Sequence, residues 1–159
     1  MITIDPPSSL SNLDLAALSK SGMARFLNRA RKAVELVGEV DVLLTSDAEL
    51  QRLNRTFRRK NKPTDVLSFP APPEISLLHA GDLAISLDTA QRQAATFGHS
   101  LRDEVRILLL HGLLHLSGLD HETDRGEMAL REAELRRELR LPVTLIARVA
   151  VPAKGRRSA

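Results

Sequence analysis

The sequence predicts an α+β fold: a single domain in which one mixed sheet of about four strands packs with four to five helices. Three observations lead to this prediction. Short segments with apolar residues at alternate positions recur along the chain, other segments show helical apolar spacing, and no linker separates two cores. A chain of 159 residues is long enough for one sizeable core. We expect one domain over residues 1–152 and a basic, disordered tail over 153–159.

The predicted strands share a period of two and end at turn residues or prolines. They cover residues 2–5, 40–44, 65–70 and 81–87. The proline-rich segment 71–79 is expected to be a mobile loop between two of them. A last short element is expected near residues 145–151.

The predicted helices begin at polar residues that can cap a helix and contain apolar residues three and four apart. They run from about Ser21 to Val37, from Ser46 to about Phe57, from Asp88 to Phe97, from Ser100 past His115, and from Asp124 to before Pro142. The second helix should bury Leu50 and Leu53, with Phe57 as a further candidate. The fourth is apolar on most sides, so we expect it to be largely buried.

Composition excludes several classes of protein. The chain has no cysteine, so neither a disulfide framework nor a thiolate metal site is possible. It has no run of 18 apolar residues, which argues against a membrane span. The first residues lack the pattern of a secretory signal, so a cytoplasmic location is expected.

Positive charge is clustered. The net charge is +3, and a run from Arg52 to Lys62 contains six basic residues and no acid. We expect this run to form a loop after the second helix. Clustered positive charge favours a polyanion partner. The alternative is a compositional bias of the genome, since arginine outnumbers lysine 18 to 5.

Three histidines form the most specific motif. His111 and His115 are four apart, so they share one helix face, and Gly118 allows a turn that returns His121 to them. Three imidazoles with one open position describe a catalytic zinc site, although nickel, copper or iron could also bind. The spacing is that of the metallopeptidase signature H-E-x-x-H-x-x-G-x-x-H, except that Gly112 replaces the glutamate. We therefore expect the fourth helix to be a zincin-like metal helix and residues 1–152 to form a metal-dependent hydrolase domain.

The replacement at Gly112 bears on the substrate. An amide nitrogen leaves poorly without the proton that the glutamate delivers, whereas a phosphodiester needs its charge neutralised. Arginine binds phosphate bidentately, which makes Arg58 and its neighbours candidates for that role. Four acids are candidates for orienting the histidines, and no role is assigned to His79 or His99. The four acids are Asp82, Asp103, Glu104 and Asp120.

Several segments together resemble the YbeY family of bacterial ribosomal RNA maturation factors. They are Leu53-Asn54-x-x-Phe57-Arg58-x-Lys60, Thr64-Asp-Val-Leu-Ser-Phe-Pro70, Gly81-Asp82 and the histidine motif, with Met128 and Glu132 fitting the downstream helix. The resemblance implies a single-strand-specific, metal-dependent endoribonuclease in 16S ribosomal RNA 3′-end maturation and ribosome quality control. It implies one zinc ion on His111, His115 and His121, and activity that depends on Arg58. RNA binding is expected from Arg55, Arg58, Arg59 and Lys60, and ribosomal or GTPase proteins are expected partners.

Two departures and two rival functions accompany this resemblance. Leu119 replaces a common aromatic residue, and Arg140 replaces a common glycine, which leaves the role of the C-terminal segment open. One rival is a zincin-type peptidase or other amide hydrolase, which the histidine spacing favours. The other is a non-catalytic ribosome assembly factor whose metal only holds the fold.

Overall fold

The sheet has four strands in the order β1-β2-β4-β3, so the predicted mixed sheet is confirmed. The computed structural model describes residues 1–61 and 64–142; the predictions for 145–151 and for the tail lie outside the described residues. β1 pairs with β2 and β2 with β4 in parallel, whereas β3 pairs with β4 antiparallel. The strands are β1 (Ile2–Ile4), β2 (Glu39–Thr45), β3 (Val66–Pro70) and β4 (His79–Ser86).

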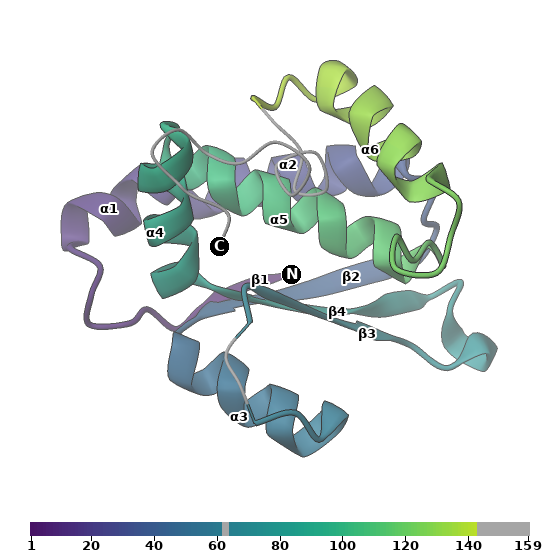
Figure 1. Cartoon of the computed structure of the whole chain (residues 1–159), viewed down its shortest axis with the longest axis horizontal. Helices are drawn as coiled ribbons and strands as arrows, with labels where there is room; N and C mark the ends of the chain where they lie inside the picture. Colours follow the sequence, from purple (N-terminus) through teal and green to yellow (C-terminus); the bar gives the residue numbers. More distant parts are fainter. Residues whose placement is uncertain (62–63, 143–159) are drawn as a thin grey trace.

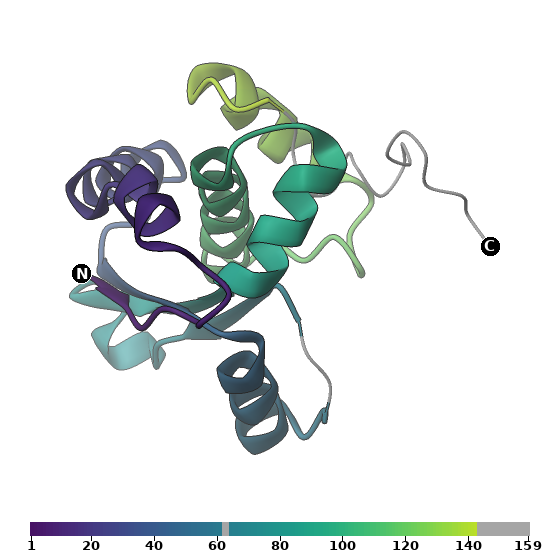
Figure 2. The same ribbon diagram turned by 90° about the vertical axis from the view of Figure 1, so that its left-hand side faces the viewer.

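The helices cover the two faces of the sheet unequally, and α3 lies alone on the face opposite the others (Figures 1 and 2). The helices are α1 (Asn12–Leu18), α2 (Lys20–Ala33), α3 (Asp47–Arg58), α4 (Leu87–Phe97), α5 (Leu101–Leu116) and α6 (Glu127–Glu138). Among the described residues, no helix combines the length and apolar character needed to cross a membrane.

The main core lies between α5 and the sheet. Strand alternation turns Val42, Leu44 and Ile85 toward the helices, and all three are buried. Most residues of α5 are buried as well, which confirms the prediction from its apolar sequence. Each fully buried aliphatic side chain contributes about 1.5–3 kcal/mol relative to exposure. The core therefore fixes α5, and any side chain that α5 carries, against β3 and β4.

Three predicted helix ends are wrong. α6 begins at Glu127, after Gly126, and not at Asp124. α2 ends at Ala33, and Val37 is 70% exposed. The chain turns there at Glu35, which has φ of 65°, and the Arg31 guanidinium donates to the carbonyls of Leu36 and Val37. α4 is capped by Ser86 instead of Asp88: the Ser86 hydroxyl accepts from the backbone N–H of Thr89 at 3.1 Å.

The prediction that the basic run forms a loop is wrong for the part of the run that lies in α3, and at Lys62 it falls outside the described residues. Arg52, Arg55 and Arg58 lie within α3, and the helix ends where Arg59 adopts a left-handed conformation with φ of 56°. Cations in the last turn complement the helix dipole, which favours helix over loop here. Leu50 is buried as predicted, but Phe57 is 65% exposed. Because α3 lies alone on its face of the sheet, only the side of the helix that packs on β3 and β4 is buried.

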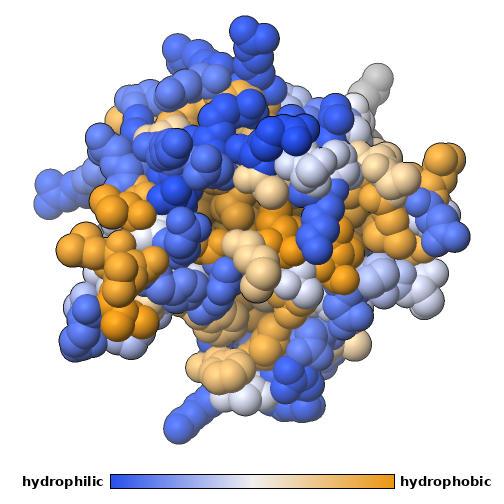
Figure 3. Space-filling model, turned by 180° about the vertical axis from the view of Figure 1, so that it is seen from behind, coloured by the Kyte–Doolittle hydropathy of each residue, from blue (hydrophilic) through white to orange (hydrophobic). Residues whose placement is uncertain are grey.

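The connection between β3 and β4 contains a short 3₁₀ helix, η1 (Pro73–Ile75), inside the predicted loop, and His79 already belongs to β4. Large apolar side chains are exposed here and at the neighbouring α2–β2 turn, where the N–H of Glu39 donates to the carbonyl of Leu78. These side chains form an apolar patch on the face of the molecule that Figure 3 shows. They are Val37, Ile75, Leu77 and Leu78.

Candidate metal centre

Three histidines converge at the C-terminal end of α5. One ligand nitrogen from each of His111, His115 and His121 lies within 4.8 Å of the others. The Nε2 atoms of His111 and His115 are 3.2 Å apart, because residues four apart share one face of the helix. Their ring centroids are 4.8 Å apart, and the ring of His121 is 5.2 Å from that of His111. This histidine group can hold a metal ion.

A glycine turn brings His121 back to the helix. α5 is capped at Ser117, and Gly118 follows with φ of 101°, a conformation that favours glycine. The N–H of Leu119 then donates to the carbonyl of Leu114 at 3.2 Å, which folds the chain back. Asp124 fixes the other side of the turn, since its carboxylate accepts from the backbone N–H groups of Gly126 and Met128.

Glu132 of α6 orients His111. Its Oε2 atom is 2.9 Å from Nδ1 of His111, and both residues are buried, with 1% and 4% exposure. A carboxylate accepts, so Nδ1 carries the proton and the Nε2 lone pair of His111 faces the other two histidines. The sequence did not assign this role. The available signal was a carboxylate on the buried side of α6, four residues after Met128 and three before Leu135.

Three of the four acids proposed from the sequence have other hydrogen-bond partners. Glu104 is 2.6 Å from Nε2 of His99 in a buried pair, and Asp82 is 3.4 Å from Nε2 of His79. Asp103 lies in the first turn of α5, and Asp120 accepts from the N–H of Glu122. Among these four acids, Asp120 is the one whose charge raises the pKa of His115.

Burial and neighbouring charge lower the pKa of His115. Desolvation is the largest cause that lowers the pKa of His115, followed by the charges of His111 and His121. A hydrogen bond involving the Leu119 backbone and the charge of Asp120 oppose this and are outweighed. Nδ1 of His121 is buried and has no hydrogen-bond partner in the described structure. The lowered pKa of His115 and the unsatisfied buried nitrogen of His121 fit a metal site.

Gly112 packs directly on the sheet. A Cβ atom at this position would lie 2.8 Å from a methyl group of Leu83. Its carbonyl oxygen is 3.4 Å from the hydroxyl of Ser68, which donates to it. The sequence lacks the glutamate of the metallopeptidase signature at this position, and the close packing of Leu83 leaves little room for any side chain there.

Arg58 is separated from the histidine group. It is exposed at the end of α3, and α3 and α5 lie on opposite faces of the sheet (Figure 1). Within residues 1–61 and 64–142, its guanidinium makes no hydrogen bond or ion pair with the histidines. The two regions approach one another through β3: Phe57 packs edge-on against Phe69, with ring centroids 5.6 Å apart.

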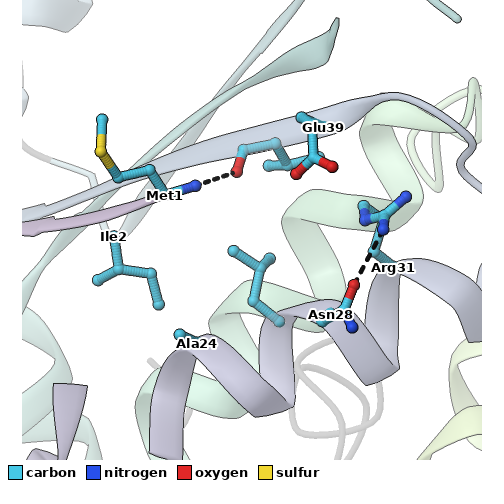
Figure 4. A pocket seen from close by; sticks show the side chains of 8 residues that line it. Met1, Ile2, Ala24, Asn28, Arg31 and Glu39 are labelled. Atoms are coloured by element: carbon cyan, nitrogen blue, oxygen red, sulfur yellow. Dashed lines mark hydrogen bonds between the residues drawn. The ribbon is translucent and has the colours of Figure 1, made fainter. Parts of the chain in front are cut away.

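Two other places in the structure are weaker candidates for a metal or ligand site than the histidine group. Asp41, His79 and Asp82 also come within 4.8 Å, but Asp82 is exposed and the N-terminal amine already pairs with Asp41 at 3.1 Å. A pocket of about 200 Å³ lies where β1 and β2 meet α2 (Figure 4). Arg31 lines it but already donates to Asn28, and no histidine contributes to it.

Comparisons with known proteins agree with one another. The family model described as Endoribonuclease YbeY matches residues 8–140. Endoribonuclease YbeY from Koribacter versatilis is 56% identical over 140 residues, covering 88% of this chain and 90% of the relative. Endoribonuclease YbeY from Solibacter usitatus is 51% identical over 135 residues, with 84% and 88% covered.

The fold also has a solved counterpart. The solution structure of TM1509 from Thermotoga maritima is 26% identical, with a TM-score of 0.55, and the match covers 99% of this chain and 100% of that one. The family model spans most of the sequence, including all three histidines and α3. The chain belongs to the YbeY family of endoribonucleases.

Proposed function

We propose that this protein is a zinc-dependent endoribonuclease that cleaves single-stranded RNA in 16S ribosomal RNA 3′-end maturation and ribosome quality control. The observation that carries the proposal is the histidine group, backed by Glu132, in a chain whose curated relatives are named endoribonucleases. The proposed setting is the ribosome in the cytoplasm, with ribosomal or GTPase proteins as partners.

The donor set fits zinc. Two nitrogen ligands at 2.0–2.1 Å from a tetrahedral zinc lie about 3.3 Å apart, and the Nε2 atoms of His111 and His115 are 3.2 Å apart. Three imidazoles without a thiolate would leave a fourth position for water or substrate. When bound there, one zinc ion per chain supplies Lewis acidity that acidifies water and polarises a phosphoryl oxygen.

The protein's own groups have separate parts in this proposal. His111, His115 and His121 hold the metal, and Glu132 keeps His111 in the tautomer that presents Nε2. The exposed basic end of α3 binds RNA phosphates. Its side chains form no ion pair among the described residues, so their charge is available to a polyanion. They are Arg55, Arg58, Arg59 and Lys60, with Arg58 expected to matter most for activity.

The test is cleavage of a labelled single-stranded RNA by zinc-loaded protein beside a His115→Ala variant purified identically. We expect cleavage by the first protein alone. Casein turnover by the zinc-loaded protein would instead support the amide-hydrolase alternative, which the packing of Gly112 against Leu83 disfavours. RNA or ribosome binding that survives chelation, with no cleavage of any RNA, would support the scaffold alternative.

A further inference from the structure

β3 is an edge strand, and its register shows which backbone groups face outward. The N–H of Ser86 donates to the carbonyl of Asp65 at 2.9 Å, and the N–H of Ala71 donates to the carbonyl of Ala80 at 3.0 Å. Bonded and non-bonded pairs alternate along an antiparallel ladder, so the odd-numbered residues of β3 bond to β4. The backbone groups of Val66, Ser68 and Pro70 therefore point away from the sheet.

Ser68 supplies the one free donor along this edge of β3. The N–H of Val66 is already used, because it donates to the carboxylate of Asp65 at 2.8 Å. Pro70 has no N–H. Within the described structure no acceptor is bonded to the backbone N–H of Ser68. An edge strand with a free donor is a ready site for a ligand.

The free edge at Ser68 lies between the histidine group and the basic end of α3. The hydroxyl of Ser68 donates to the carbonyl of Gly112, which directly follows His111. The loop that carries His121 and the free edge of β3 lie on the same side of α5 (Figures 1 and 2). On the other face, Phe69 packs against Phe57, the neighbour of Arg58.

We propose that the outer edge of β3 is an RNA-docking element, in which the backbone N–H of Ser68 donates a hydrogen bond to a phosphate oxygen. An RNA strand that crosses this edge meets the arginines of α3 on one face and the histidine group on the other. This inference rests on the proposed function and adds the path of the substrate. A backbone N–H suits a phosphate because it donates without base preference and is held rigidly by the ladder.

The first test is an NMR titration of ¹⁵N-labelled protein with a short single-stranded oligoribonucleotide, with a chelator present so that the RNA stays intact. The Ser68 amide proton should shift downfield as RNA binds. The Val66 amide, equally outward but already bonded, is the internal control and should shift less. RNA binding that leaves the Ser68 amide unmoved, or that moves both amides equally, would overturn the proposal.

A pair of variants tests the same donor by affinity. Ser68→Pro removes the outward N–H without taking a bond from the β3–β4 ladder, just as Pro70 is accommodated at the equivalent position. Ser68→Ala loses only the hydroxyl and is the reference. Ser68→Pro should bind the RNA about tenfold more weakly than Ser68→Ala, the loss expected for one hydrogen bond to a charged acceptor. Equal affinities in two folded variants would overturn the proposal.

The outcomes separate this inference from the proposed function. RNA that binds and shifts the Ser68 amide, but is not cut when zinc is restored, would refute the nuclease and leave the docking edge standing. Cleavage of RNA that binds without shifting the Ser68 amide would support the nuclease and refute the docking edge. Absence of any RNA binding would refute both.

Discussion

Replacing Glu132 with glutamine should weaken zinc binding while leaving the fold intact. Glu132 is 1% exposed and its carboxylate lies 2.9 Å from Nδ1 of His111, so no water can replace it without opening the core. Glutamine keeps the size and can keep a hydrogen bond, but it removes the charge that makes His111 a stronger ligand. Loss of such an outer partner costs about 10- to 100-fold in metal affinity, or about 1.4–2.8 kcal/mol.

The assay is competition for zinc between the protein and a chromophoric chelator, with circular dichroism to confirm folding. Glu134→Gln is the matched control, since Glu134 is on the same helix but is 61% exposed and pairs with Arg131. The control should bind zinc like the unaltered protein. A folded Glu132→Gln variant with unaltered zinc affinity would refute the idea that Glu132 orients a metal ligand.

Three further predictions follow from the packing and the charges. Gly112→Ala should lower the free energy of unfolding, measured in urea, by about 1–3 kcal/mol, because the new methyl group overpacks against Leu83. If that contact is the cause, adding Leu83→Val should recover part of the loss. Arg58→Ala should lower RNA cleavage about tenfold with zinc content unaltered, whereas Arg52→Ala, already paired with Glu49, should have less effect; zinc loss in Arg58→Ala would contradict the assigned role. Burial raises the pKa of Asp47. Hydrogen bonds from Ser86, Thr89 and Arg92, together with the charge of Arg92, outweigh this and lower the pKa below its ordinary value. Its stabilisation should be present above about pH 4 and lost as the pH falls further, so Asp47→Asn should destabilise at pH 7 and much less at pH 3 in urea unfolding; equal losses would contradict this.

The histidine group was predictable because it depends on local geometry. The four-residue spacing on a helix and a glycine three residues later are both visible in the sequence, and the structure brings the three rings together. The strands were predictable for the same reason, since alternation over a few residues reports which face is buried.

Glu132 and the placement of Arg58 depend on tertiary structure. Glu132 contacts a histidine 21 residues away, and nothing between them specifies how α6 packs. Arg58 was expected on a loop because the apolar spacing of Leu50, Leu53 and Phe57 ends one residue before it, whereas α3 includes Arg58. Which face of the sheet α3 covers is set by Leu67 and Ala84, which form a separate small core with Leu50.

The most direct test of the account is a zinc titration of metal-free protein that follows RNA cleavage and bound zinc together. The account predicts that cleavage rises with zinc and levels off at one ion per chain, and that His115→Ala neither binds that ion nor cuts. Cleavage that is independent of zinc, or equal in the His115→Ala variant, would contradict the claim that this histidine group is the nuclease centre.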